Sequence, residues 1–442
     1  MDVDDPRWEG PLFERRNSRP TESRSPMRHA LKLVATVAAL FCSAAFAQSN
    51  EIRVGLLLPT SGPAAKSGQD TLEGVKLAYD IINGSFDIPL PYAKTQGITS
   101  KGGAKIRLII EDHGGRPERG AAIAERMITQ DKVHIIQGAF HSAVASPASQ
   151  VAEKYGIPFV TGTSEAASLT ERGFKTFFSV TPTSNDIARD FFSFLTEISK
   201  AKNVPLKSLA VMHVNDNWGS SLAQASEHLY RQYGFETLSL ISYNSPVSDL
   251  RSEVLKLKAG SPDVLLQASY DADAILAVRN YTTLQFTPKA ILGMGAAFAT
   301  PDFIKAMGKN ADYTFSHTKF DVALLKKRKA AAAVSKLYEQ RVGRPLWDTP
   351  VRAFTASLVI ADALQRAKSL APEDIIQALR ETNIDGADTV APYKGVKFNE
   401  KGQNVLANGL ITQIRDGQHY AVWPNDIAVR EAVFPAPAWD KR

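Results

Sequence analysis

Hydroxyl side chains recur in this sequence at the points where predicted strands end. Ser142 follows the apolar run 133–137, and Thr163 and Ser164 follow the run 157–160. At the start of a helix such a hydroxyl lies beside free backbone N–H groups, and together they can hold an anion. For Ser142, a simple helix N-cap is the alternative interpretation. The pattern predicts binding of a small polar or anionic ligand.

The motifs of common catalytic sites are missing from the sequence. It contains no G-x-S-x-G elbow, no G-x-x-x-x-G-K-[ST] phosphate loop and no H-E-x-x-H metal pair. Gly293-Met-Gly295 lacks the third glycine of a dinucleotide loop. Glu111-Asp112-His113 falls on a predicted strand, where neighbouring side chains point to opposite faces. We therefore predict no enzyme activity, no cofactor and no metal site.

Composition and charge exclude several classes of protein. The 442 residues carry 52 Lys and Arg against 46 Asp and Glu, a formal net charge of +6, without a concentrated basic stripe. This balance argues against a nucleic-acid partner. The run Lys326-Lys-Arg-Lys329 is interpreted as a solvated helix face, with docking to an acidic partner as the alternative. The single cysteine, Cys42, excludes a disulfide framework.

The N-terminal region has the pattern of a secretory signal peptide over residues 27–47. A basic start precedes the apolar stretch 33–41, and Ala45-Phe46-Ala47 places small residues before a cleavage point. The apolar stretch is too short for a membrane anchor. Residues 1–26 are interpreted as a non-translated or disordered leader, with translation starting at Met27. The sequence thus predicts an exported mature chain that starts at residue 48.

Short β-rich runs alternate with amphipathic segments along the rest of the chain. The expected strands of the first series are 52–58, 106–110, 133–137 and 157–160, and its expected helices are 73–83, 118–129 and 143–155. The second series has expected strands 208–214, 237–243, 263–268 and 290–294, and helices 186–200, 219–234, 249–259 and 271–284. Helices are expected at 321–341, 351–367 and 372–382, and strands at 395–399 and 409–414. Such alternation predicts parallel sheets covered by helices on both faces.

Two α/β lobes facing each other predict a ligand site in the cleft between them, beyond the C-terminal ends of the strands. The first lobe is expected to comprise residues 48–182 and about 316–385. The second is expected to comprise residues 183–315 and about 386–442. Because the chain returns to each lobe, more than one segment should cross the hinge.

Several segments resemble the branched-chain amino-acid binding proteins of bacterial ABC importers. Val54–Pro63 (VGLLLPTSGP) looks like the opening of that family, and Gly138–Ser142 (GAFHS) and Ile157–Ser164 (IPFVTGTS) resemble its two ligand loops. Asn215–Gly219 (NDNWG) occupies the place of its "D-x-x-Y-G" element, and Pro262-Asp263 precedes the next core strand as it does there. The resemblance covers nearly all of residues 51–420.

The resemblance implies the two-lobed type I periplasmic-binding-protein fold, α/β with two doubly wound lobes joined by a hinge. Such proteins close over a ligand and then dock on a membrane permease in the periplasm. The ligand-binding residues it implies for this chain are Ser142, Thr163, Ser164, Glu165, Trp218, Tyr270, Ser61 and His141. Ser67 lies on the same loop as Ser61 and ranks with it. For Trp218 and Tyr270, a role in the core is the alternative.

Two positions depart from the pattern of amino-acid binders. Gly295 stands where relatives place an acidic residue that holds the ligand's ammonium, and Glu165 stands where they commonly have a threonine beside the carboxylate. A glutamate beside an anion site is repulsive unless it is protonated or turned away. Either Glu165, with Asp271, has taken over the ammonium, or the ligand is not an α-amino acid. An amide or an aromatic carboxylate is then the expected ligand.

The sequence thus predicts a monomeric, periplasmic solute-binding component of an ABC importer. The alternative is a ligand-sensing domain of the same fold, for amides or aromatic acids. A cytosolic regulator would carry no export signal, and a receptor would need a membrane segment after residue 420.

Overall fold

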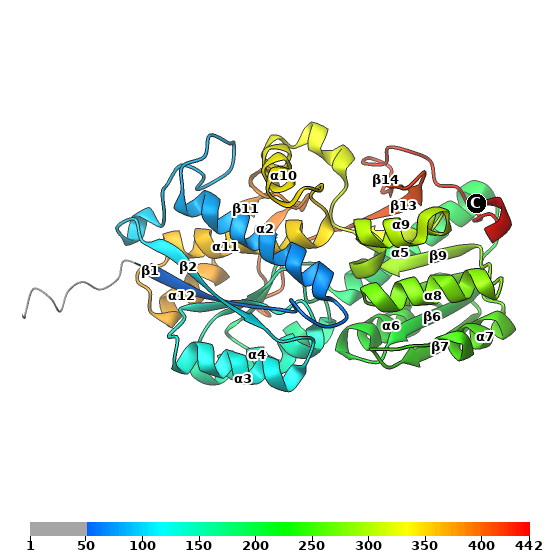
Figure 1. Ribbon diagram of the computed structural model, residues 1–442, viewed down its shortest axis with the longest axis horizontal. Coiled ribbons are helices and arrows are strands. Elements are labelled where there is room, and N and C mark those ends of the chain that lie inside the picture. The colour runs from blue at the N-terminus through cyan, green and yellow to red at the C-terminus, as the bar shows by residue number, and fades with distance from the viewer. Residues whose placement is uncertain (1–50) are drawn as a thin grey trace, which may run out of the picture. The chain divides into compact units, whose positions relative to one another are not determined.

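The computed structural model describes residues 51–442, in which strand–helix alternation builds two lobes, each around its own sheet (Figure 1). The first sheet is entirely parallel and has the order β2-β1-β3-β4-β5. Its strands are β1 (Glu51–Leu58), β2 (Lys105–Asp112), β3 (Ile135–Gly138), β4 (Phe159–Thr161) and β5 (Phe177–Ser179). Strand β1 is apolar almost throughout because helices cover both faces of a parallel sheet.

The helices of the first lobe form two layers around this sheet. They are α2 (Ala65–Asn83), α3 (Pro117–Thr129), α4 (Ser142–Tyr155), α10 (Lys329–Val342), α11 (Asp348–Arg366) and α12 (Pro372–Arg380). Helices α3 and α4 pack together on one face, and α2 and α11 on the other (Figure 1). Buried Gln137 on β3 ties the layers, since its Nε2 donates to the Ala353 carbonyl and to Ser357 Oγ of α11, each at 3.0 Å.

The second sheet is mixed and has the order β14-β13-β10-β9-β8-β6-β7. Its strands are β6 (Ser208–Val214), β7 (Thr237–Tyr243), β8 (Val264–Ala268), β9 (Ala290–Met294), β10 (Phe315–Thr318), β13 (Leu410–Arg415) and β14 (Gln418–Trp423). Its helices are α5 (Ser184–Lys202), α6 (Asn217–Leu229), α7 (Arg251–Gly260), α8 (Asp271–Thr283) and α9 (Pro301–Met307). Strand β13 is antiparallel to both of its neighbours. The expected doubly wound α/β architecture is confirmed.

Two helices differ from the expected ranges. Helix α2 begins at Ala65, eight residues before the expected start at residue 73. Ser67, Asp70 and Thr71 in its first turns are polar yet buried. Gly68 lies so close to the preceding loop that a Cβ would come within 1.8 Å of the Pro59 carbonyl oxygen. The expected helix 321–341 is interrupted: a 3-10 helix, Val322–Lys327, precedes α10. The basic run lies across this break and not on one helix face.

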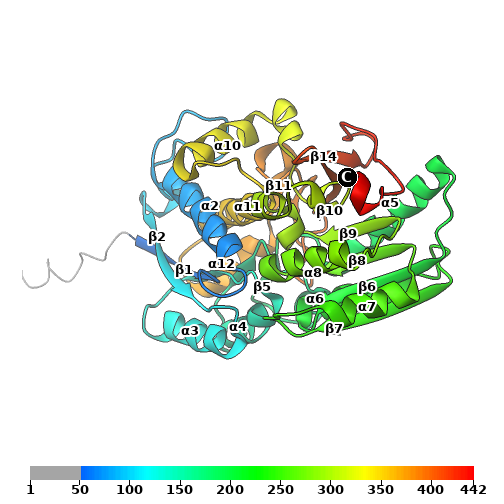
Figure 2. The same ribbon diagram turned by 45° about the vertical axis from the view of Figure 1, so that its right-hand side comes forward.

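The chain passes between the two sheets three times, near residues 180–184, 319–321 and 405–409 (Figure 2). A small antiparallel pair, β11 (Asn383–Asp385) and β12 (Gly395–Lys397), precedes the last passage. The return to the second lobe occurs later than the expected residue 386, because Gln403 bridges in parallel to Ser179 at the end of β5.

The predicted leader (1–26) and signal peptide (27–47) lie outside the described residues. Among the helices of residues 51–442, none combines the length and the apolar character needed to cross a membrane.

Candidate functional site

The loops that follow β3 and β4 meet at one edge of the first sheet. Ser142 is the first residue of α4 and is completely buried, and its Oγ accepts hydrogen bonds from the backbone N–H groups of Glu165 (3.2 Å) and Ala166 (3.1 Å). The N-cap position belongs to His141, which makes no side-chain cap bond. Ser142 therefore joins the two loops, and the N-cap interpretation is wrong.

The loop after β4 is held by its own side chains. Thr161 Oγ1 accepts from the N–H groups of Thr163 (3.3 Å) and Ser164 (3.0 Å). The carbonyl of Glu165 accepts from both the N–H (2.7 Å) and the Oγ (2.9 Å) of Ser184 at the start of α5. All five residues are buried. The loop is thus fixed in one conformation, and it aims the side chain of Glu165 inward.

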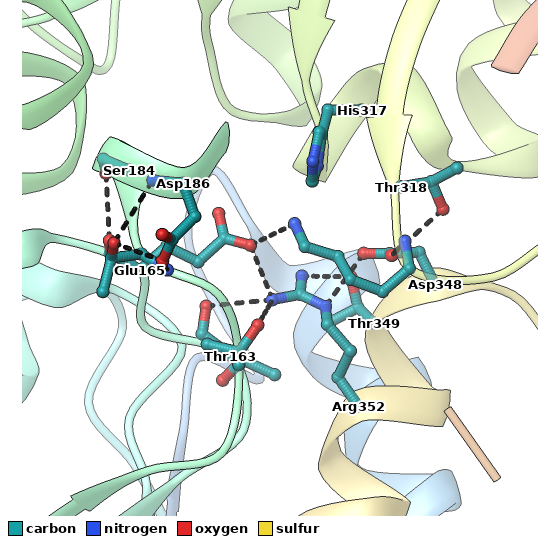
Figure 3. Close-up of polar contacts among 12 residues, drawn as sticks. Thr163, Glu165, Ser184, Asp186, His317, Thr318, Asp348, Thr349 and Arg352 are labelled. Carbon is teal, nitrogen blue, oxygen red and sulfur yellow. Dashed lines mark hydrogen bonds and ion pairs between the residues drawn. The ribbon is translucent and has the colours of Figure 1, made fainter. Parts of the chain in front are cut away.

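The carboxylate of Glu165 is the centre of a buried charge cluster (Figure 3). Its Oε1 contacts the Lys319 ammonium and lies 3.0 Å from Arg352 Nη1, and its Oε2 accepts from Trp218 Nε1 at 3.2 Å. Lys319 directly follows β10, Arg352 lies on α11 and Trp218 on α6. The side chains of Glu165, Lys319 and Arg352 are at most 3% exposed. Both lobes and a crossing segment therefore meet at one carboxylate.

Asp348 completes this cluster on the far side of the guanidinium (Figure 3). Its Oδ2 lies 2.9 Å from Arg352 Nε, and its Oδ1 accepts from the backbone N–H of Lys319 (2.5 Å). Burial alone would raise the pKa of Asp348, but Arg352 and Lys319 lower it below its usual value. The four side chains of Glu165, Asp348, Lys319 and Arg352 form a cluster without net charge. In low dielectric, buried charges persist only when matched in this way.

The position of Gly295 explains the missing acid. Its φ is +52°, and a Cβ there would lie 3.7 Å from Lys319 Nζ. Gly295, the position at which the resemblance implied an acidic residue, therefore faces an ammonium of this chain. Glu165 is the partner of that ammonium, and Asp271 is bonded elsewhere.

The two aromatic residues predicted from the sequence lie together. The rings of Trp218 and Tyr270 are stacked, with centroids 5.1 Å apart, and Tyr270 also contacts the ring of His141 from the first lobe at 4.6 Å. Tyr270 Oη donates to Asp216 Oδ2 (2.7 Å). His141 is neutral, since burial lowers its pKa to about 3. Aromatic side chains from both lobes thus contact one another beside the charge cluster.

Ser61 and Ser67 take separate places on the loop and helix after β1. Ser61 is exposed, and its Oγ donates to Asp112 Oδ2 at 2.5 Å at the end of β2, so no contact joins it to the charge cluster within the described residues. Ser67 is buried and reaches the other lobe, where its Oγ lies 2.8 Å and 3.0 Å from the two carboxylate oxygens of Asp271 on α8. Ser67 and Asp271 thus form a direct bond between the lobes.

Sequence reasoning missed Lys319, Arg352 and Asp348. Lys319 follows a strand that was not predicted. Arg352 stands between Val351 and Ala353 in a helix whose first seventeen residues, except Asp362, are buried. A lone arginine amid apolar residues, four positions after an aspartate, is the signal that could have revealed it.

The comparisons with known proteins agree with this geometry. A family model described as "Periplasmic binding protein" matches residues 51–418. A Leu/Ile/Val-binding protein homolog 7 of Brucella suis biovar 1 (strain 1330) is 30% identical over 414 residues, covering 90% of this chain and 98% of the relative.

Solved structures show the same fold. The leucine binding protein LivK of Thermotoga maritima MSB8 has a TM-score of 0.71 at 18% identity, covering 84% of this chain and 97% of the other. A solute binding protein of an ABC transporter from R. palustris, in complex with benzoate, has a TM-score of 0.72 at 17% identity, covering 88% and 97%. The chain belongs to the periplasmic binding protein family, within its leucine-binding-protein-like branch.

Proposed function

We propose that this protein is the periplasmic solute-binding component of an ABC importer, which binds a small carboxylate-bearing ligand between its lobes and delivers it to the membrane permease. The observation that carries the proposal is the meeting of Lys319 and Arg352 on one buried carboxylate, that of Glu165. Two cations and an indole N–H converge there as they would on a bound carboxylate. The protein acts by binding and release, without catalysis.

The charge balance of the cluster supports a specific exchange. Glu165, Lys319, Arg352 and Asp348 sum to zero, so a ligand carboxylate enters favourably only where Glu165 gives up its place. Glu165 is held by its side-chain contacts to three groups, and rotation of that side chain frees all three at once. In this mechanism the ligand carboxylate takes the partners of Glu165, and the Lys319 ammonium occupies the position that an amino-acid ligand would need.

Aromatic carboxylates are the ligands that the surroundings favour. Trp218 and Tyr270 present stacked rings next to the cations, and stacking on such rings stabilises a flat ligand. The R. palustris relative binds benzoate. Glycine at 295 offers no counter-charge for an α-ammonium.

A hinge motion links binding to transport. Hydrogen bonds between the lobes include Ser67–Asp271 and Ala167 N–Ser221 Oγ (3.1 Å). Three passages of the chain connect the lobes covalently. We infer that these contacts form when the lobes close on the ligand and break when they separate, so that the closed form is the one that the permease receives.

Ligand affinity is expected to rise as the pH falls from 7 to 5, because closure buries Asp271. Burial raises the pKa of Asp271 to about 6 in the closed arrangement, although Ser67 opposes the rise, whereas an exposed aspartate titrates near 3.9. Below about pH 6, Asp271 therefore takes up a proton in the closed form, whereas it stays ionised in the open form. Linkage predicts about a tenfold gain between pH 7 and pH 5.

Calorimetric titration of wild type and Asp271→Asn at both pH values checks this expectation. The asparagine variant retains a partner for Ser67 but cannot titrate. Its affinity should therefore be about the same at pH 7 and pH 5, whereas that of wild type should differ about tenfold. Equal pH dependence in the two proteins would contradict the role of Asp271.

The ligand class is tested by a thermal-shift comparison of benzoate, benzamide and phenylalanine on residues 48–442. The three probes share a ring, but benzamide lacks the charge and phenylalanine adds an ammonium. Benzoate at about 100 times its dissociation constant should add about 2.7 kcal/mol of stability and raise the Tm, while the other two should not. A shift with phenylalanine or benzamide and none with benzoate would refute the proposed ligand class.

A further inference from the structure

A cavity of about 400 Å³ lies where the lobes and a crossing segment meet. Its walls come from residues 299–304 of the second lobe and from the crossing segment 318–322. The loop 345–347 with the first residue of α11, and Gly417 with the first two residues of β14, complete them. Neither Glu165 nor Tyr270 lines it. The volume falls in the range of small-molecule sites.

Apolar side chains form most of the cavity wall. Phe320, Leu346 and Trp347 are buried, and Ile304 of α9 is half-buried. The polar atom of Trp347 is already used, since its Nε1 donates to Asp70 Oδ2 at 3.0 Å. These walls suit the apolar body of a ligand.

Asp321 places an unmatched carboxylate oxygen at the cavity. Asp321 is only 3% exposed, and its Oδ1 accepts a hydrogen bond from the Ala323 N–H at 2.7 Å. Oδ2 has no hydrogen-bond partner among the described residues. Asp348, the other carboxylate in the wall, is matched by Arg352. Burial raises the pKa of Asp321, and the backbone N–H groups of Ala323 and Ala421 oppose the rise. No cation of the described residues pairs with this carboxylate, so a cationic group of a ligand is favoured beside it.

His419 adds a second acceptor. Thr412 Oγ1 donates to the Ser316 carbonyl at 3.4 Å and lies 3.0 Å from His419 Nδ1. In the tautomer that carries its proton on Nδ1, this nitrogen donates to Thr412 Oγ1 and Nε2 carries a lone pair. A hydrogen-bond donor bound at Nε2 selects this tautomer. Nε2 is buried and has no partner within the described part of the chain. Burial lowers the pKa of His419 to about 4, so the ring stays neutral at pH 7.

We propose that this cavity is a second ligand site, which shares only Asp348 with the Glu165 cluster and takes a small primary amine with an apolar body. The ammonium has three donors, which serve Asp321 Oδ2 and His419 Nε2, and its charge balances Asp321. The apolar body lies against Trp347 and Phe320. Since the walls come from both lobes, an occupant favours the arrangement in which they are together. The proposal does not depend on the ligand of the Glu165 cluster.

Calorimetric titration with benzylamine tests the site, with benzyl alcohol as the uncharged probe of similar shape. Wild type should bind benzylamine with a dissociation constant of about 1 mM and benzyl alcohol at least about tenfold more weakly. Asp321→Asn, which keeps the Oδ1 acceptor for Ala323, should weaken benzylamine about tenfold. Ser142→Ala should leave it unchanged.

Two tryptophan variants of α9 test whether benzylamine occupies this cavity, because one fills it and the other lies outside it. Ile304→Trp fills the cavity and should abolish benzylamine binding, whereas Lys305→Trp, on the exposed neighbouring position of α9, should not. The proposal is overturned if wild type gives no heat with benzylamine. It is also overturned if Asp321→Asn and Ile304→Trp both bind as wild type does, or if Ser142→Ala alone abolishes binding.

Discussion

Replacing Glu165 by alanine is expected to lower the free energy of unfolding by about 3–5 kcal/mol. The change leaves the fully buried Lys319 ammonium without its partner and removes the acceptor of the Trp218 indole N–H. An unpaired charge in low dielectric costs more than the lost contacts themselves. Urea unfolding of wild type and variant, followed by circular dichroism, measures the difference.

Two controls separate charge from packing. In the double variant Glu165→Ala/Lys319→Met both charges are gone, so most of the lost stability should return. Glu171→Ala breaks the exposed pair between Lys401 and Glu171 and should cost less than about 1 kcal/mol. If Glu165→Ala and Glu171→Ala cost the same, the buried cluster has no special energetic role.

Replacing Lys319 by methionine is expected to weaken benzoate binding about 100-fold, or about 2.7 kcal/mol. The fold should persist at reduced stability, because Glu165 keeps Arg352 and Trp218 as partners although the cluster loses its charge balance. The ligand carboxylate, however, would meet one cation in place of two. Calorimetric titration measures the affinity, and urea unfolding shows that the variant is folded.

Lys401→Met is the matched control, since it removes an exposed lysine whose ion pair is with Glu171 and with no residue of the cluster. Its benzoate affinity should stay within about twofold of wild type. Undiminished affinity in folded Lys319→Met would show that the ligand does not use this ammonium, and the exchange mechanism with Glu165 would fail.

The fold and part of the site could be predicted because strand ends and helix starts leave local signals. Apolar runs followed by hydroxyl residues located the loops of Ser142 and Thr163, and the resemblance to known binding proteins pointed to Trp218 and Tyr270. These signals depend on neighbours in the sequence. The same reasoning identified Gly295 and Glu165 as unusual positions.

The partners of Glu165 could not be predicted because they come from distant parts of the chain. Lys319 and Arg352 lie 154 and 187 residues away from it. Only the passage of the chain back into the first lobe brings α11 to the end of β4. Similarly, the first turns of α2 could not be predicted because they contain the polar residues Ser67 and Asp70. These are buried because they bond to Asp271 and Trp347, which lie far away in the sequence.

The three passages between the sheets have a consequence for biosynthesis. The first lobe needs α11, which bonds to Gln137, and the bridge from Ser179 to Gln403. Its core therefore cannot be completed until the ribosome has made nearly the whole chain, although its strands are made first. Domains fold as units during synthesis, so the nascent polypeptide stays without a finished lobe for most of its translation. During that time it is accessible to chaperones.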